Sequence, residues 1–583
     1  MDIIQSISAL GPTRAAAVAL LRSKLPHLAW TDAPNNKNPR SSGRTVSFGD
    51  NSTMTVSGLR ATGLAELVAV GERGERIGTA ISLSKTSVVV TLLDPVSIPP
   101  KVSPRKTKQA DEAAVYKSNL TGRLSIPLGT LVQGTGRSLS ARFSYRSSGR
   151  VLDVLGAPLD GKEPPNPAGT VPLESPALSV LERRPVTEPL CTGLLAFDAL
   201  IPLGHGQREA LMGDPKTGKT EAALLLTQTQ TSLDSAIKII FINVGQRTAQ
   251  IASTLSSLRE RDSLRNTTLV TSYAADPTLL QTLTPSSGCA LAERYARKGF
   301  KAVTIYDTLS RHADAYRELS LILRRSPGRE GYPPDIFYKH ARLLERAGAF
   351  KIATKTGVKR AGSATALPIL DLDNGDLSGF LPTNLVSITD GQAVLSRDLF
   401  NDGFRPALDA GISVSRLGSS VQPRALRAVS SRLKIALTEF KTVSRVADVT
   451  TDLSDDMLLQ LTRGKALRET LKQDVGEVCT PAKAAVILHA ATYGSFDLIP
   501  TEAVKEATTA LCAKILEEGS SSDAIDKARS LILRAIQEDI ALKPAEVYIL
   551  LFAIKKCLTK LGYAAPNLSM RGKAVRLPSA GLV

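Results

Sequence analysis

The chain has few aromatic residues and few cysteines, and it has no long apolar run. Aromatic side chains make up 4% of the 583 residues, which leaves little material for the stacking platforms that bind single-stranded nucleic acid. The five cysteines, at 191, 289, 479, 512 and 557, form no CxxC pair, which argues for reduced thiols and against a disulfide framework or a zinc site. The longest apolar stretches, such as Tyr548–Ile554, are far shorter than the roughly 20 residues of a membrane-spanning helix. We therefore expect any membrane association to be indirect, through partner proteins.

The net charge of the chain is strongly positive, at +18, with a pI of about 9.7. A basic balance is typical of proteins that bind nucleic acid or other anionic partners. Here the lysines and arginines are spread along the whole sequence. We therefore expect no nucleic-acid binding, and interpret the charge as that of a protein docked on acidic partners or working in a basic compartment. The five histidines are scattered too, and we interpret each as an isolated surface or core residue.

The length predicts several domains, because 583 residues are too many for one hydrophobic core. Residues 1–42 form an N-terminal extension that is rich in alanine, leucine and serine and carries several basic residues. This composition fits an organelle transit peptide or an ordinary N-terminal helix. Between 43 and 149, short alternating apolar runs punctuated by glycine predict a small β-barrel or sandwich. A charged, proline-containing insertion at about 95–120 interrupts these runs and is expected to be exposed.

Two further domains follow from changes in the hydrophobic period. From about 150 to 421, apolar strand-like segments alternate with helical ones, a pattern typical of an α/β domain built on a mainly parallel sheet. From 422 to 583 the apolar residues recur at three- and four-residue spacing, which predicts a helical domain. The predicted fold class is a multidomain chain with an N-terminal β-barrel, a central α/β domain and a C-terminal α-helical domain.

The segment GDPKTGKT satisfies the phosphate-loop pattern G-x-x-x-x-G-K-[ST]. It lies between EALM, which predicts a buried strand, and EAALLLTQTQ, which predicts a helix, and the binding mechanism requires that order. Backbone N–H groups of such a loop wrap the phosphates of a nucleotide, and the helix N-terminus adds positive potential. The lysine would contact the terminal phosphates, and the last threonine would bind Mg²⁺. We therefore predict a site for ATP or ADP with Mg²⁺ formed by Gly213, Asp214, Pro215, Lys216, Thr217, Gly218, Lys219 and Thr220, with Thr220 as a metal ligand.

Two apolar runs end in polar residues that can serve this site. AVTIYD ends at Asp307, a carboxylate at the C-terminal edge of a strand, where it can hold Mg²⁺ through water; the alternative is a simple turn residue. IIFIN leads into VGQR, a position where such ATPases often keep the general base that orients water. Here the residue is Gln246, and an uncharged amide polarises water weakly, so we predict slow hydrolysis at this site. The alternative is that Gln246 caps the next helix.

The segment RPALDAGISVSRLGSS, from Arg405 to Ser420, is rich in small residues that would let a loop project Arg416 outward. An arginine so placed can reach the nucleotide of a neighbouring subunit as an arginine finger, which accelerates phosphoryl transfer by roughly 10³–10⁵. The alternative is a solvated surface arginine, and these residues by themselves leave both interpretations open.

Six segments between about 43 and 464 resemble, in order, signatures of the α subunit of F-type ATP synthases; among them are GRTVSFGDNSTMTVSGLR, LIPLGHGQREALMGDPKTGKT and RPALDAGISVSRLGSS. The resemblance implies a β-barrel, a RecA-like P-loop NTPase domain and a helical domain. It implies a hexamer in which this subunit alternates with catalytic β subunits around a central rotor stalk, beside a peripheral stalk. Such a subunit binds Mg-ATP without turnover during proton-coupled ATP synthesis. It would reach the membrane only through the complex, on the matrix side of the mitochondrial inner membrane or, alternatively, at a bacterial or plastid membrane.

The resemblance also implies roles for particular residues. Arg416 would complete the site of the neighbouring β subunit, and Gln246 stands where catalytic subunits have glutamate. Arg405 and Pro406 match the segment that lies beside the adenine. Enzymatic activity would then belong to the assembled synthase, with the site of this chain non-catalytic.

The sequence departs from the family pattern at several contacts to the nucleotide. Pro215 and Lys216 replace the arginine and glutamine of the usual GDRQTGKT, and Thr308 stands where a second aspartate is usual. Asp409 stands where asparagine is common, and the adenine-side glutamine of the C-terminal region is expected to be replaced near Asp448. The glycine–lysine–threonine core of the loop is unchanged.

Two other functions remain open from the sequence. A structural paralogue of the α subunit that has lost its nucleotide would explain the changes at Pro215, Lys216 and Asp448. A self-sufficient hexameric RecA-like ATPase, such as a secretion or RNA-translocating ring, is favoured by the basic charge, but Gln246 and the α-like barrel segment argue against it.

Overall fold

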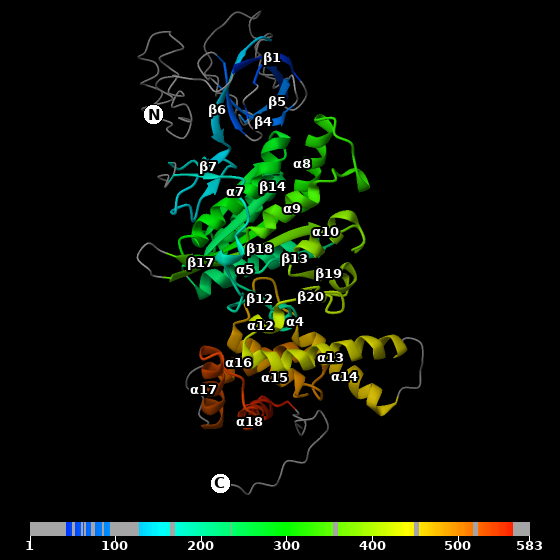
Figure 1. The fold of residues 1–583 in the computed structure, drawn as a ribbon. Helices are drawn as coiled ribbons and strands as arrows, with labels where there is room; N and C mark the ends of the chain where they lie inside the picture. The colour runs from blue at the N-terminus through cyan, green and yellow to red at the C-terminus, as the bar shows by residue number, and fades with distance from the viewer. Residues whose placement is uncertain are drawn as a thin grey trace, which may run out of the picture.

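The computed structural model describes residues 42–563, apart from gaps at 49–52, 60–61, 63–65, 72–75, 84–86, 94–127, 164–168, 235, 354–358, 448–453 and 517–522. The N-terminal extension before residue 42 and the insertion predicted at 95–120 lie outside the described residues. Figure 1 shows three parts stacked along one axis, with a small barrel at one end, an α/β domain in the middle and a helical domain at the other end.

The N-terminal part is a closed barrel with the strand order β1-β2-β5-β4-β3-β6. Its strands are β1 (Ser42–Phe48), β2 (Thr53–Ser57), β3 (Glu66–Val70), β4 (Arg76–Leu83), β5 (Ser87–Leu92) and β6 (Leu131–Ser138). The side chains of Met54 and Val56 on β2 and of Val88 and Val90 on β5 alternate into a common apolar interior, as the two-residue period of a strand requires. The predicted β-barrel is confirmed.

The central domain is built on one large sheet with the order β20-β19-β13-β18-β16-β14-β15-β8. Its core strands run parallel. Antiparallel pairs occur at its margins, where β17 pairs with β18 and β20 pairs with β19. The bounds are β8 (Val151–Leu152), β13 (Glu209–Gly213), β14 (Lys238–Gln246), β15 (Thr267–Tyr273), β16 (Lys301–Asp307), β17 (Gly348–Ala353), β18 (Lys359–Asp371), β19 (Gly391–Leu395) and β20 (Val414–Ser415). The short strand β10 (Arg183–Arg184) pairs with β17 at the margin of this sheet. Two separate two-stranded sheets are formed by β7 (Ser140–Arg142) with β9 (Thr170–Pro172) and by β11 (Pro189–Leu190) with β12 (Leu203–Gly204).

Helices cover both faces of this sheet. Successive residues of β14 alternate between two apolar clusters: Ile239 and Phe241 face one side with α5, and Ile240 and Ile242 face the other with α7 and α8. Parallel strands buried on both faces read as continuous apolar runs, which explains the sequence IIFIN. The helices are α4 (Leu195–Leu200), α5 (Lys219–Leu233), α6 (Thr248–Glu260), α7 (Thr278–Ala296), α8 (Leu309–Ile322), α9 (Ile336–Glu345), α10 (Phe380–Ile388), α11 (Arg397–Asn401) and α12 (Gly418–Val421).

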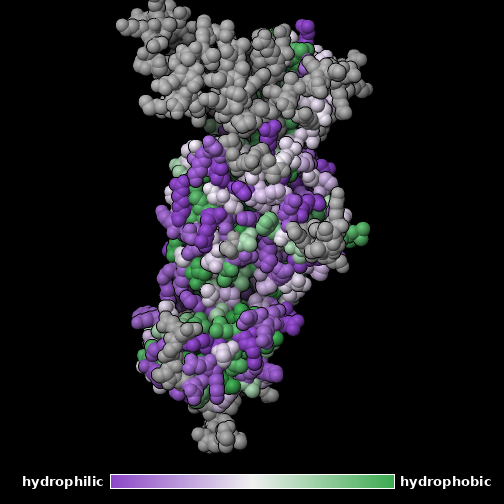
Figure 2. All heavy atoms as spheres, turned by 90° about the vertical axis from the view of Figure 1, so that its left-hand side faces the viewer, coloured by the Kyte–Doolittle hydropathy of each residue, from purple (hydrophilic) through white to green (hydrophobic). Residues whose placement is uncertain are grey.

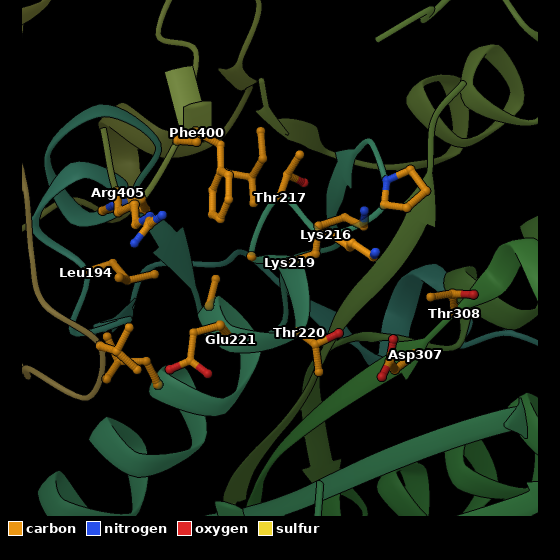
Figure 3. A pocket seen from close by; sticks show the side chains of 18 of the residues that line it. Leu194, Lys216, Thr217, Lys219, Thr220, Glu221, Asp307, Thr308, Phe400 and Arg405 are labelled. Carbon is orange, nitrogen blue, oxygen red and sulfur yellow. The ribbon is translucent and has the colours of Figure 1, made fainter. Parts of the chain in front are cut away.

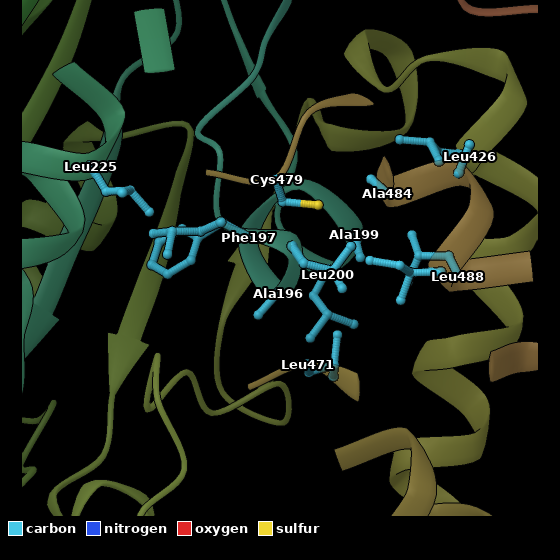
Figure 4. Close-up of a cluster of buried hydrophobic side chains, with 14 of the residues drawn as sticks. Ala196, Phe197, Ala199, Leu200, Leu225, Leu426, Leu471, Cys479, Ala484 and Leu488 are labelled. Carbon is cyan, nitrogen blue, oxygen red and sulfur yellow. The ribbon is translucent and has the colours of Figure 1, made fainter. Parts of the chain in front are cut away.

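The C-terminal part is helical, as predicted. It comprises α13 (Arg424–Ala447), α14 (Asp455–Thr470), α15 (Pro481–Thr492), α16 (Val504–Leu516), α17 (Asp523–Gln537) and α18 (Pro544–Lys560). One apolar cluster continues from the nucleotide side of the sheet through α4 into these helices, and Figure 4 shows Phe197 and Leu200 of α4 between Leu225 on one side and Leu488 on the other. This shared core holds the helical domain against the edge of the sheet where the phosphate loop lies.

Within the described residues, none of the helices combines the length and the apolar character needed to cross a bilayer. Figure 2 shows a mostly hydrophilic surface on one face, with apolar side chains scattered among the polar ones.

Candidate functional site

The phosphate loop joins the C-terminal end of β13 to the N-terminus of α5, in the predicted strand–loop–helix order. Gly218 adopts a left-handed conformation with φ +92°, which glycine tolerates at no steric cost. Gly213 has no room for a side chain, since a Cβ there would lie 2.6 Å from the carbonyl oxygen of Leu395. Thr217 Oγ1 donates a hydrogen bond to the Asp214 carbonyl at 2.8 Å. The loop is therefore closed on itself with its helix N-terminus open toward a cavity.

Asp214 anchors the loop from behind. Its buried carboxylate accepts a hydrogen bond from the Gly375 N–H at 2.7 Å and forms an ion pair with Arg397 at 3.2 Å. These contacts join the loop to the segments after β18 and at the start of α11. The side chain therefore supports the loop from outside the cavity and is not among the residues that line it.

Lys219 is nearly buried, with 6% of its side chain exposed. Its ammonium group donates to the carbonyls of Gly213 and Asp214 at 2.7 and 2.5 Å and forms an ion pair with Asp371 Oδ1 at 3.0 Å. The lysine thus sits at the centre of the loop, with its charge held at the point where phosphates would bind.

Asp307 ends β16 beside the loop, where the sequence placed it. Burial raises the pKa of its carboxyl from 3.8 to about 6, and the hydrogen bond from Gln246 opposes that shift. Gln246 Nε2 donates to Asp307 Oδ2 and to the Asp307 carbonyl, both at 3.0 Å. In the parallel register, Asn243 of β14 pairs with Asp307 of β16. The side chains of Gln246 and Asp307 therefore meet because the two strands end at the same edge of the sheet.

A cavity of about 740 Å³ opens in front of these groups. Figure 3 shows Lys216, Lys219, Thr220 and Asp307 around one part of it and Phe400 with Arg405 around another. All of the predicted nucleotide-binding residues line it except Gly213 and Asp214, which form the loop behind; the lining includes Pro215, Lys216, Thr217, Gly218, Lys219, Thr220, Gln246, Asp307, Arg405 and Pro406. The structure therefore brings together side chains that are nearly 200 residues apart in the sequence.

The two ends of the cavity differ in chemistry. The loop end carries lysines and a helix N-terminus, which suit phosphate groups. The other end is lined by Leu194, Phe400 and the segment 473–476, and the Arg405 guanidinium lies 4.6 Å from the centre of the Phe400 ring. Flat, apolar and cationic surfaces of this kind suit a planar aromatic ring system.

The residues present fit a nucleotide with a divalent cation. Gln246 Oε1 and Thr308 Oγ1 are buried and have no hydrogen-bond partner within the described residues, and both belong to residues that line the cavity. Buried polar atoms without partners are rare in folded proteins, so a polar ligand or water at this position would satisfy them. Thr220 and Asp307 supply the oxygen atoms that Mg²⁺ prefers.

Arg416 lies away from this cavity. It follows β20 at the edge of the sheet, is exposed, and is not among the residues that line the cavity of its own chain. Its guanidinium donates to the carbonyls of Thr389 and Val386, each at 3.3 Å, and its backbone N–H donates to the Asp390 carbonyl at 2.9 Å.

Several residues that line the cavity were not predicted from the sequence, and those with a charged, aromatic or amide side chain placed to act on a ligand include Arg311, Asp371, Phe400 and Gln473. The expectation for Asp448 falls outside the described residues. The structure instead brings a glutamine, Gln473, to the end of the cavity opposite the loop, 25 positions further along the chain. Sequence signals existed for Asp371, which closes an apolar strand as Asp307 does, but Gln473 follows a helix with no distinguishing pattern.

The interpretation of all histidines as isolated is wrong for His312 and His340. These two buried rings meet, with His312 Nδ1 3.0 Å from His340 Nε2, because α8 and α9 both pack on the same side of the sheet. Burial lowers the pKa of both. They form no metal site, since no cluster of three or more histidine, cysteine or acidic ligands occurs in the described part of the chain. All five cysteines are free.

Comparison with known proteins gives two kinds of match. The nucleotide-binding domain of the ATP synthase alpha/beta family matches residues 193–415, and the C-terminal domain of the ATP synthase alpha/beta chain matches residues 422–540. The chain is also 42% identical over 419 residues to the ATP synthase subunit alpha of Aquifex aeolicus (strain VF5). That alignment covers 72% of this chain and 80% of the relative.

Proposed function

The chain belongs to the α-subunit family of F-type ATP synthases, and we propose that it is a non-catalytic ring subunit that binds Mg-ATP or Mg-ADP in its own cavity. Through Arg416 it assists the catalytic site of a neighbouring β subunit. Thr220 and Asp307 would hold the metal, Lys219 and the loop the phosphates, and Arg405 with Pro406 the adenine side.

Gln246 carries the non-catalytic part of this proposal. Hydrolysis is fastest when a positioned side chain accepts a proton from the attacking water. Gln246 occupies the end of β14 beside Asp307. Its Nε2 donates to that residue, and its Oε1 has no hydrogen-bond partner in the described part of the chain. A neutral amide oxygen can orient a water molecule but cannot take its proton, so this geometry supports binding with slow turnover.

The setting of Arg416 supports a role in a neighbouring site. A guanidinium has five N–H donors, and two hydrogen bonds to backbone carbonyls use only part of them. The side chain is therefore oriented by its own chain while donors remain for an anionic group from outside. Its exposure at a sheet edge, outside the lining of the chain's own cavity, supports a target on a partner.

Assembly with other ATP synthase subunits follows from the family. We place the chain in a hexamer that alternates with catalytic β subunits, around a central rotor stalk and against a peripheral stalk, in a synthase driven by protons. The complex would lie at the matrix side of the mitochondrial inner membrane or, alternatively, at a bacterial or plastid membrane. Mass spectrometry of the mature N-terminus in the purified complex distinguishes a cleaved transit peptide from a retained extension.

The test uses the ring reconstituted with its catalytic partner subunits. Arg416→Ala is expected to lower ATP hydrolysis by roughly 10³-fold or more, while nucleotide bound to this chain stays unchanged. Arg427, an exposed arginine on α13, provides the matched control, and Arg427→Ala should retain activity. A fully active ring containing Arg416→Ala would show that the arginine finger assignment is wrong.

Native mass spectrometry and turnover assays separate the remaining alternatives. A chain purified without nucleotide from an active ring would indicate a structural paralogue that has lost its ligand. Steady hydrolysis by the isolated chain, stimulated by RNA, would instead indicate a self-sufficient hexameric ATPase. Bound Mg-nucleotide with negligible turnover supports the proposal.

A further inference from the structure

The ammonium group of Lys219 has all of its hydrogen bonds occupied. A lysine has three donors, and here they face the carbonyls of Gly213 and Asp214 and the carboxylate of Asp371 at 2.7, 2.5 and 3.0 Å. The two carbonyls belong to the phosphate loop itself. Among the described residues, Asp371 is therefore the charged group within ion-pair distance of Lys219 that a phosphate group must displace.

The position of Asp371 allows its carboxylate to move away from Lys219. It is the last residue of β18, and register sets it beside Gly213 of β13. Its backbone N–H donates to Ser310 Oγ at 2.9 Å, which fixes the main chain on α8. Its side chain is 37% exposed and lines the cavity, so the carboxylate has room to turn away from the lysine while its backbone stays in place.

A second carboxylate lies on the same side of the lysine. Asp307 also lines the cavity. Burial is the main cause of its raised pKa, the negative charge of Asp371 adds to the shift, and Gln246, Arg311 and Lys219 oppose it. Two acidic side chains thus face the region where phosphates would bind, together with the cationic groups of Lys219, Lys216 and Arg311, which line the same cavity.

Resting on the function proposed above, we propose that Asp371 is a specificity-determining residue that makes this cavity select the magnesium complex of a nucleoside triphosphate over the metal-free nucleotide. A metal-free triphosphate must take Lys219 from Asp371 and then lie beside the carboxylate of Asp371, which has lost its ion-pair partner, and near that of Asp307. The magnesium complex carries two additional positive charges that offset this repulsion. Like charges a few ångströms apart interact strongly at a protein surface, so the discrimination is on the order of tenfold to a hundredfold in affinity.

The competing explanation is that Asp371 only holds Lys219 in place. The two roles predict different results for Asp371→Asn, which keeps the size of the side chain and its ability to accept a hydrogen bond but removes its charge. A holding role predicts that both forms of the nucleotide bind more weakly by a similar factor. A selective role predicts that the metal-free form gains affinity while the magnesium form gains none.

The experiment measures ATP binding to the full-length chain by calorimetry, with excess EDTA and with excess MgCl₂. The ratio of interest is the dissociation constant for metal-free ATP divided by that for Mg-ATP. In Asp371→Asn this ratio is expected to fall about tenfold, mainly through tighter binding of metal-free ATP. Asp373, an exposed carboxylate two residues away that does not line the cavity, gives the matched control, and Asp373→Asn should leave the ratio unchanged. Circular dichroism confirms that each variant is folded.

Three results would overturn the inference: an unchanged ratio in Asp371→Asn, a parallel loss of affinity for both forms, or the same fall in Asp373→Asn. A wild-type chain that binds both forms equally also contradicts the inference alone. A wild-type chain that binds neither form contradicts the proposed function, and the inference with it.

Discussion

Replacing Gln473 by alanine tests how the helical domain closes the nucleotide cavity. Gln473 follows α14 and reaches back to the segment before α4. Its Oε1 accepts from the Leu195 N–H at 2.6 Å, and its Nε2 donates to the carbonyls of Gly193 and Glu477 at 3.0 and 3.2 Å. Leu195 begins α4, and the first N–H groups of a helix have no partner within it, so Gln473 acts as the cap that α4 itself lacks.

The size of the effect follows from these contacts. Each hydrogen bond contributes about 1 kcal/mol net, and leaving a buried partner unpaired costs about 1–3 kcal/mol. Gln473 is only half-buried, so water can replace part of what is lost, and we expect a total cost of about 1–2 kcal/mol. Because residues 474–476 line the cavity, a loss of this size on cavity closure weakens nucleotide binding by roughly five- to thirtyfold.

The assay combines hydrogen exchange with nucleotide titration. In Gln473→Ala the amide of Leu195 should exchange faster, and the dissociation constant for Mg-ATP should rise. Gln250 lines the same cavity and its side chain has no hydrogen bond within the described residues, so Gln250→Ala is the matched control. Unchanged protection of Leu195 in Gln473→Ala would refute the idea that this side chain couples the two domains.

Three further predictions concern stability. Arg346 and Glu293 form a buried ion pair at 2.9 Å, so Arg346→Met should cost about 3 kcal/mol by leaving a buried carboxylate short of a partner; chemical denaturation showing no loss would contradict this. Burial lowers the pKa of His489 from 6.5 to about 4, so the folded state binds a proton at His489 only at lower pH than the unfolded state does. The contribution of His489 to the free energy of unfolding should therefore fall by about 1.5–2 kcal/mol between pH 6.5 and 5, which is measured as the difference in pH dependence between the wild type and a His489→Gln variant. A Cβ on Gly362 would lie 1.9 Å from the Ala296 carbonyl oxygen. Gly362→Ala should therefore destabilise the chain by about 1–3 kcal/mol. A variant as stable as the wild type would show that α7 can shift away at no cost in free energy.

The phosphate loop is an example of a structure that can be predicted from local sequence pattern. The spacing of Gly213, Gly218, Lys219 and Thr220, together with the apolar runs around them, predicted the strand, the turn and the helix that the structure contains. These features are predictable because they depend on neighbouring residues only: glycine at a left-handed position, apolar residues at the period of a strand or a helix, and polar residues where a strand ends. The domain order followed from changes in the same periods.

Contacts between distant segments could not be predicted in this way. Nothing in the sequence around Gln473 marks it as a partner of Leu195, 278 positions earlier, and His312 with His340 reads as two separate core residues. The orientation of Arg416 away from its own cavity depends on which edge of the sheet β20 joins.

The sequence by itself thus determined that the chain has a phosphate loop, a nearby carboxylate and an amide in place of a base. The tertiary structure decided which groups surround them: Asp371 on Lys219 and Gln473 across the cavity. The physical reason is that strand order in the sheet and packing of α4 against the helical domain set distances between remote residues, and neither is encoded in any short stretch of sequence.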